Sequence, residues 1–575
     1  MNKIIRYLNA AFMVGFLLST TSCDDFLDKG PLAEFTDENY WISESNVKSF
    51  AWMFYDDFIG YGNGTGTTAD FYFQSSSATG ALNFSDDLCN ASFLNFQSTP
   101  STTNSDWKGS YAKIRRANLM LRNIPTVPKM SAEAINHWSA VARFFRAYHY
   151  FLLVQRFGDV PYVTEYTTNT TDASLIYLPR SSRNDVMDKV FEDLDFAAKN
   201  IRKSDGVNTV NYYVVCAVQA RAGLYEGTYR KYQQAASGAK YLELAKTASA
   251  AIMANTAFSL NATHQSVFNS IDLGSSKEMI LYKSYLPSVW MHSIQAYTNT
   301  SSIINGLSRA AVESYACNDG LPIGQSANYQ GDASIEQVRA NRDLRLLSTI
   351  APKYAYSGKD DGGLVASTGY RVVLYNNPGL SGTQVTTTGQ NHIDAPLFTL
   401  SEVYLNYAEA CAELNQITQA DLDMSINKLR PRAGLPNITL VGVDGVSVNG
   451  VEINDPERTN ALEQKTGVVS PLLWEIRRER RAELLGWTTI RLNDLMRWKK
   501  GLYLDMTENP KVGQGAKVGA ANKGNTTVNP DGYILPFGSN SRSFVSPKHY
   551  LNSVPTAEIA LYAAEGVVLT QNPGW

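Results

Sequence analysis

The sequence predicts a mostly α-helical fold, in which helix hairpins pack as a tetratricopeptide-like superhelix with minor β-structure and long loop-rich insertions. Apolar residues recur with a helical period through much of 106–257 and 398–430. Consecutive helical segments form hairpins of roughly 34–45 residues, the length of tetratricopeptide-type repeats. Stretches rich in Ser, Thr, Gly, Asn and Tyr interrupt this pattern.

The first 22 residues have the pattern of an export signal. Lys3 and Arg6 precede the apolar stretch Leu8–Leu18, which is too short to span a membrane. Small or polar residues then lead directly to Cys23. We interpret 1–22 as a bacterial lipoprotein signal peptide and Cys23 as the lipidated first residue of the mature chain. An ordinary signal peptide beside an incidental cysteine is the alternative.

Helices are expected on both sides of a long irregular region. Ser131 provides an N-cap for a helix that reaches about Phe157. This helix is apolar on nearly all sides from Val141 to Val154, so it must be buried between other helices. The expected helices cover 37–58, with N-cap residues Thr36 and Asp37, and then 106–124, 131–157, 182–202, 210–230, 239–255, 398–414 and 418–430.

These elements indicate a single mature domain, 23–575. Its helical scaffold lies mainly in 37–257 and 396–500, and the loop-rich insertions are 60–104, 258–395, 435–467 and 505–545. Short β-like pieces occur at Met279–Tyr282 and Tyr370–Tyr375. Insertions of this length in a compact chain usually carry function.

Composition and motifs exclude several function classes. The formal net charge is −3 and no basic patch stands out, so no nucleic-acid partner is expected. The chain has no HExxH zinc motif, no CxxC pair, no GxSxG elbow and no Walker A loop. The sequence therefore predicts no catalytic residue, no metal site and no cofactor.

One segment near the end of the scaffold is dense in opposite charges. It contains Glu475, Arg478, Glu479, Arg480, Glu483, Arg491, Asp494 and Arg497. Several of these residues can pair at i,i+3 spacing along one helix. We interpret the segment as an ion-pair network that pins the last helices to the scaffold. A catalytic carboxylate pair is the alternative, but arginines this dense would keep carboxylates ionised.

Six segments, in order along the chain, carry a resemblance to a known family. They are CDDFLDKGPLAEFTDENYW (23–41), ARFFRAYHYFLLVQRFGDVPYVTE (142–165), LSEVYLNYAEACAEL (400–414), INKLRPRAGLP (426–436), EIRRERRAELLGWTTIRLNDLMRW (475–498) and NPGW (572–575). Together they resemble the SusD-like (SusD/RagB) family of outer-membrane nutrient-binding lipoproteins. One departure is that Leu485 precedes Gly486, where the family usually has an acidic residue.

The resemblance implies a non-catalytic lipoprotein that captures oligosaccharides at the cell surface. It also implies a SusC-like TonB-dependent transporter as partner, and a lipid anchor in the outer membrane with the protein facing the exterior. The acidic pair Asp24 and Asp25 resembles a surface-export signal and favours that orientation. Two alternatives remain: a surface glycoside hydrolase, which would need two positioned carboxylates, and a structural surface protein or adhesin.

The family binds glycans through aromatic rings on exposed loops, so candidate rings should lie in polar, loop-like surroundings. Stacking on a sugar removes ring and C–H area from water, at about 25 cal/mol per Å². The insertion 258–395 offers Tyr285, Trp290, His292 and Tyr297, with Asn299 as a polar partner. The earlier irregular segment offers Phe71, Tyr72 and Phe73, with Asp70 and Gln74 as polar partners. Trp290 is our first candidate for the platform and Tyr72 the second; the alternative is that these rings pack loops onto the scaffold.

Overall fold

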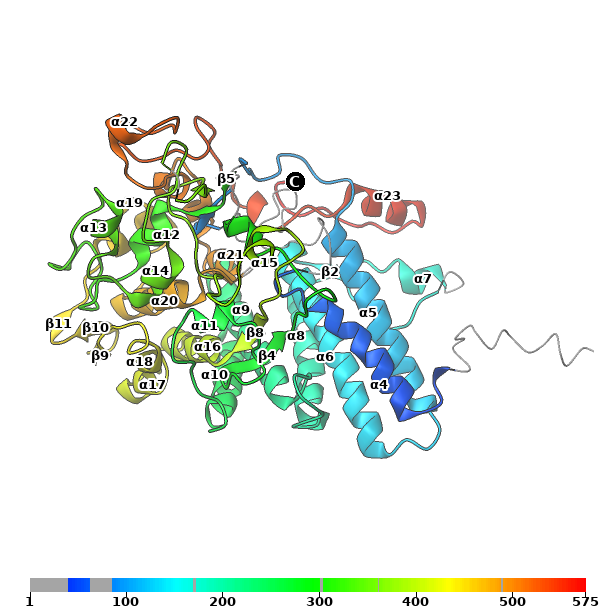
Figure 1. Cartoon of the computed structure of the whole chain (residues 1–575). Coiled ribbons are helices and arrows are strands. Elements are labelled where there is room, and N and C mark those ends of the chain that lie inside the picture. Colours follow the sequence, from blue (N-terminus) through cyan, green and yellow to red (C-terminus); the bar gives the residue numbers. More distant parts are fainter. Residues whose placement is uncertain are drawn as a thin grey trace, which may run out of the picture.

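The computed structural model describes residues 40–62, 85–90, 92–168, 172–299, 303–359, 361–487 and 490–575 (Figure 1). Cys23, the expected cap at Thr36 and Asp37, and the candidates Asp70, Phe71, Tyr72 and Gln74 lie outside these residues.

The fold is mostly helical, as the sequence predicts. The longer helices are α4 (Glu44–Trp52), α5 (Ser105–Asn123), α6 (Ala132–Phe157), α8 (Arg183–Asn200), α9 (Tyr212–Gln233), α10 (Ala239–Met253), α16 (Leu400–Glu413), α20 (Pro471–Leu484), α21 (Ile490–Arg497) and α23 (Thr556–Ala564). Shorter ones are α7 (Ala173–Ile176), α11 (Ser266–Asn269), α12 (Arg309–Ser314), α13 (Ile335–Arg339), α14 (Leu344–Thr349), α15 (Thr383–Thr386), α17 (Gln419–Asp423), α18 (Ile426–Leu429), α19 (Ala461–Thr466) and α22 (Gly519–Asn522). None of the described helices is both long and apolar enough to cross a membrane.

Helix α6 forms where the sequence places it. The Ser131 hydroxyl accepts a hydrogen bond from the Ala134 N–H at 3.1 Å, which caps the helix. Gly158 ends it with φ +69°, a conformation that favours glycine. Sixteen of its 26 residues are buried, and it packs between α5 and α8. The prediction of a helix buried on nearly all sides is confirmed.

The scaffold continues through pairs of packed helices. Helix α8 contacts α9, α9 contacts α10, α10 contacts α16, and α16 contacts α20 (Figure 1). Two expected helices differ in detail. The described part of 37–58 is α4 followed by a 3₁₀ turn, Met53–Asp57, and 418–430 is divided into α17 and α18.

The β-structure is minor. β4 (Met279–Lys283) pairs antiparallel with β8 (Ala395–Thr399), and β9 (Ile438–Val441), β10 (Gly445–Val448) and β11 (Val451–Glu452) form an antiparallel sheet. The remaining pairs are β1 (Leu88–Cys89) with β6 (Gly306–Leu307), β2 (Val160–Pro161) with β3 (Arg180–Ser181), and β5 (Ile303–Ile304) with β7 (Val365–Ala366). The β-like piece expected at Tyr370–Tyr375 forms isolated bridges at Arg371 and Val372 rather than a strand.

Two large apolar clusters fill the described interior. One is centred on α5, α6, α8 and α9, and the other joins the insertion 258–395 to α16 and α20. Strands β4 and β8 lie at their boundary, since Leu281 and Phe398 belong to the first cluster whereas Met279 and Ala395 belong to the second. The insertion therefore packs on a core that it shares with α16 and α20, here called the insertion's core, and this core supports any site that the insertion carries.

Candidate functional site

Trp290 lies at the end of a tight turn that follows β4. Leu286 and Trp290 exchange backbone hydrogen bonds of 2.9 and 3.0 Å, and Ser288 between them has φ +62°. Leu286 is 56% exposed and Val289 is 68% exposed, whereas Trp290 is half-buried against the insertion's core. We call residues 286–290 the Trp290 turn. It presents an apolar tip to solvent with one aromatic ring beside it.

A lysine supports this ring from the scaffold side. The Lys283 Nζ lies 5.6 Å from the centre of the Trp290 ring and donates to the Phe58 carbonyl at 2.7 Å. Burial lowers the pKa of Lys283 to about 8. The cation and the ring attract each other, which helps to fix the ring's orientation.

The base of the Trp290 turn is anchored in the interior. The Tyr285 hydroxyl donates to the Gly62 carbonyl at 2.7 Å and accepts from the Tyr61 N–H at 2.9 Å. The Tyr285 ring packs 4.5 Å from that of His292, whose pKa burial lowers to about 3. Both side chains are buried. Gly62 is the last described residue before the segment that contains the second group of candidates, 70–74.

A buried carboxylate also holds the turn, and no sequence signal indicates it. The Asp394 oxygens accept from the Tyr285 N–H at 2.8 Å and the Leu273 N–H at 2.9 Å. Burial raises the pKa of Asp394 to about 6.

Tyr297 and Asn299 lie in less accessible positions than Trp290. Tyr297 is half-buried against the insertion's core. Asn299 is 6% exposed, and its amide donates to the Gln295 carbonyl at 2.9 Å and to the Asn376 side chain at 2.6 Å. Its oxygen accepts from Arg371 at 3.2 Å. The polar atoms of Asn299 are therefore bonded within the chain. Among the sequence candidates that the structure describes, Trp290 is the best placed to meet a ligand.

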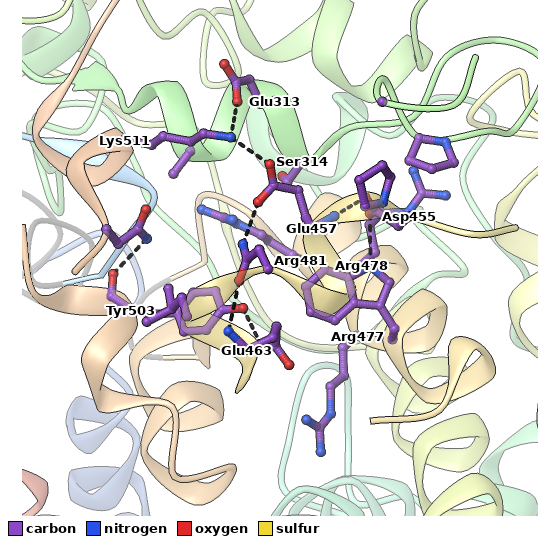
Figure 2. A pocket seen from close by; sticks show the side chains of 18 of the residues that line it. Glu313, Ser314, Asp455, Glu457, Glu463, Arg477, Arg478, Arg481, Tyr503 and Lys511 are labelled. Atoms are coloured by element: carbon purple, nitrogen blue, oxygen red, sulfur yellow. Dashed lines mark hydrogen bonds and ion pairs between the residues drawn. The ribbon is translucent and has the colours of Figure 1, made fainter. Parts of the chain in front are cut away.

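A second feature, which sequence reasoning missed, is a cavity of about 430 Å³ bounded by α12, α19, α20 and α21 (Figure 2). We call it the charged pocket. Lys511 bridges Glu313 at 2.7 Å and Glu457 at 2.8 Å, and Lys500 pairs with Glu463 at 2.7 Å. Its lining residues are spread from Arg309 to Lys511, so no local motif could have indicated it.

The ion-pair network expected from the sequence includes arginines that line this pocket, and it is confirmed. Arg345 contacts Asp343, Glu479 and Glu483 at 2.7, 2.8 and 3.1 Å. Arg430 contacts Glu475 at 3.0 Å and Glu479 at 2.5 Å. Most of these pairs join α20 to other elements, whereas only Arg478–Glu475 and Arg497–Asp494, among the described residues of this segment, use the expected i,i+3 spacing.

The network fixes the charge state of its carboxylates. Burial alone would raise the pKa of Glu479, but the guanidinium groups of Arg345, Arg430 and Arg478 lower it to about 2. Glu409, which is buried against Arg497 and Arg480, has its pKa lowered to about 2 in the same way. Such carboxylates are ionised hydrogen-bond acceptors, which suits a clamp better than a general acid.

In the part of the chain that the structure describes, potential metal ligands are scattered and the thiols are buried. No three His, Cys, Asp or Glu side chains there are grouped to hold a metal ion. Cys89, Cys216, Cys317 and Cys411 are buried free thiols. Burial raises the pKa of Cys89 to about 12, which keeps this thiol protonated.

Comparison with known families identifies the chain. A model of the SusD family matches residues 277–575, and a second, described as starch-binding and associating with the outer membrane, matches residues 25–213. The chain belongs to the SusD family. The resemblance carried by the six sequence segments is thereby confirmed.

Individual relatives of this SusD-family chain are distant. It is 25% identical over 270 residues to SusD-like protein P38 of Formosa agariphila, a match that covers 46% of this chain and 48% of that protein. It is 22% identical over 450 residues to a SusD-like protein of Bacteroides ovatus, covering 75% and 77% of the two chains. The chain thus matches about half the length of the first relative and about three quarters of the second.

Solved structures show the same fold. A SusD-like carbohydrate-binding protein of Bacteroides fragilis superposes with a TM-score of 0.68 at 21% identity, covering 90% of this chain and 98% of that one. A laminarin-binding SusD-like protein superposes with a TM-score of 0.57 at 16% identity, covering 93% and 100%.

Proposed function

We propose that this SusD-family protein is a non-catalytic surface lipoprotein that captures glycans and delivers them to a SusC-like TonB-dependent transporter. The observation that carries the proposal is the family match over 277–575. The solved relatives named for carbohydrate or laminarin binding support the same ligand class. Lipid attachment at Cys23 would hold the protein at the outer membrane, facing the exterior; the description of the second family model supports this location.

The Trp290 turn is the proposed ligand contact. Its ring is partly open and is oriented by Lys283, and exposed apolar residues lie beside it. A flat ring of this kind can stack on the C–H face of a sugar. Tyr72, Asp70, Phe71 and Gln74 remain candidates for the same surface. Gly62, which the Tyr285 hydroxyl contacts at the base of the turn, is the last described residue before their segment. Tyr297 and Asn299 are weaker candidates, because Tyr297 is half-buried and Asn299 is buried.

A binding assay that also follows hydrolysis tests the function. The purified protein is incubated with a panel of soluble and insoluble polysaccharides, while retention of protein and release of reducing ends are both measured. We expect at least one glycan to retain the protein with no sugar released. Retention with steady product release would instead establish a glycoside hydrolase, and no retention on any glycan would favour a structural protein.

The anchor and the partner need a separate experiment. Cys23→Ala should release the protein from the membrane or stop its maturation, whereas the wild-type protein solubilised from native membranes should co-purify with a β-barrel transporter. A Cys23→Ala variant that stays at the outer membrane would contradict the anchor. Wild-type protein that repeatedly purifies alone would contradict the transporter partner.

A further inference from the structure

The charged pocket has unused hydrogen-bond donors on one wall. Arg478, Arg481 and Arg491 line it and are nearly buried. Each is held from behind by a carboxylate, in the pairs Arg478–Glu475 at 2.6 Å, Arg481–Asp87 at 2.9 Å and Arg491–Asp86 at 2.7 Å. These contacts use the Nε and Nη2 atoms, and the three Nη1 groups make no hydrogen bond to any described residue. Their guanidinium planes are thus fixed before any ligand arrives.

The pocket also offers acceptors and an oriented ring. The Trp474 indole N–H donates to Asp455 at 2.9 Å, and the other Asp455 oxygen accepts from the Glu457 N–H at 3.0 Å. Asp455 forms no ion pair with a described residue, so its remaining lone pairs can accept from a ligand. Trp474 is half-buried and lines the cavity. Trp498, in contrast, is buried, and the guanidinium groups of Arg477 and Arg497 lie 4.4 and 4.5 Å from its ring centre.

The charges around the pocket nearly cancel. Seven Arg and Lys side chains and five Asp and Glu side chains line it, and the carboxylates of Glu413, Glu475, Asp86 and Asp87 lie behind the arginines. A free anion would meet these carboxylates at short range, and a cation would meet the guanidinium wall. A ligand whose groups both donate and accept hydrogen bonds, without net charge, fits both walls.

We propose that the charged pocket is a second carbohydrate site that binds a neutral sugar of one or two units, apart from the Trp290 turn. Sugar hydroxyls can accept from the free Nη1 groups and donate to Asp455, while a C–H face packs on Trp474. The volume of about 430 Å³ is within the range of small-molecule sites, roughly 300–1,000 Å³. This inference extends the proposed function to a site where the end of a glycan chain, rather than a long stretch of it, is held.

Calorimetric titration of the full protein with neutral disaccharides tests the proposal. The probes are cellobiose, lactose and xylobiose, with digalacturonic acid and inorganic sulfate as charged counterparts. Ala310→Trp fills the cavity from α12, and its matched control is Ala420→Trp, which places the same ring on the exposed face of the short helix α17. Trp474→Ala removes the ring, with Trp52→Ala on α4 as its control because Trp52 is 47% exposed on the scaffold.

We expect a neutral disaccharide to bind with an affinity that changes less than about twofold between 50 and 500 mM NaCl. Ala310→Trp and Trp474→Ala should each weaken it by about tenfold or more, while both controls leave it unchanged. The proposal is overturned if none of the neutral probes binds, if binding survives both pocket variants, or if the charged probes bind instead with steep salt dependence. A sugar whose binding is lost in Trp290→Ala but kept in Ala310→Trp would overturn the second site and leave the proposed function standing.

Discussion

Helices α6 and α20 both lie in the protein interior, but different forces hold them there. The buried residues of α6 are mostly apolar, and they include Phe144, Phe145, Phe151 and Leu153. Of the eleven buried residues of α20, six are charged, namely Glu475, Arg477, Arg478, Glu479, Arg480 and Glu483. One helix is held by non-directional apolar burial and the other by ion pairs with defined partners.

The ion pairs of α20 fix the positions of its side chains more precisely than apolar packing fixes those of α6. Apolar packing is roughly proportional to buried area and tolerates small shifts, whereas a guanidinium held by two carboxylates has one geometry. The network ties α20 to Arg345, to Arg430 and to Asp86, which come from three separate parts of the chain. The wall of the charged pocket is therefore set by ion pairs, while the scaffold supplies bulk stability.

Arg345→Met should have the largest effect. Arg345 is 1% exposed and compensates Asp343, Glu479 and Glu483. Removing one partner of a buried network leaves uncompensated charge. We therefore expect the free energy of unfolding to fall by about 4 kcal/mol, within the usual range of 3–5 kcal/mol. Urea unfolding followed by circular dichroism measures it. A loss under about 1 kcal/mol would mean that the network is not what holds α20.

Leu153→Ala should be somewhat less costly. Leu153 is 1% exposed in the core around α6. Truncation leaves a cavity and removes apolar burial, which typically lowers the free energy of unfolding by 2–5 kcal/mol. We expect a loss of about 3 kcal/mol. The same urea experiment applies, and a cost near zero would contradict tight packing around α6.

The pH dependence of these two variants separates the two regions. The folded pKa of Glu479 is about 2, below its ordinary value of 4.5. A lowered pKa gives stability that is present above the ordinary pKa and is lost as pH falls toward the folded value. Without Arg345, Glu479 takes up a proton more readily, so the cost of Arg345→Met should shrink by about 1–2 kcal/mol between pH 7 and pH 3.

The cost of Leu153→Ala should stay constant over the same range, because no titrating group is removed. Asp394, whose pKa is raised to about 6, acts in the opposite sense below that pH. Asp394 is present in the wild type and in both variants, so its contribution cancels when their free energies of unfolding are compared. Equal pH profiles for the two variants would contradict the distinction between the regions.

Lys189→Ala should have the smallest effect. Lys189 pairs with Glu192 at 2.8 Å on the exposed face of α8. Exposed pairs of this kind are screened by solvent and contribute little to stability, so we expect no resolvable change in the free energy of unfolding. A loss comparable to that of Arg345→Met would show that burial is not what distinguishes the network.

The sequence predicted the α6 region better than the α20 region for a physical reason. Helical periodicity and the Ser131 cap are local, so the bounds of α6 follow from neighbouring residues. The charge density of α20 indicated a network, but its partners Arg345, Arg430 and Asp86 are distant in sequence. The i,i+3 pairing expected from spacing accounts for only part of it.

The binding-site residues were also predicted only in part, because their surroundings come from distant parts of the sequence. A Trp in polar, loop-like sequence indicated Trp290, and the structure places that ring beside an exposed turn. The sequence ranked Trp290 first, but it did not show that Tyr285 and His292 are buried or that the Asn299 amide is bonded to Gln295 and Asn376. The charged pocket was missed because segments from 309 to 511 must fold before it exists.

The most direct test of the proposed function is the affinity of Trp290→Ala for the glycan that the wild-type protein retains most strongly, with Trp52→Ala as the control. We expect Trp290→Ala to weaken binding by about 1–4 kcal/mol, the range of a hot-spot aromatic, with an unchanged thermal unfolding midpoint. An affinity equal to that of wild type, in both Trp290→Ala and Tyr72→Ala, would contradict glycan capture at the Trp290 turn.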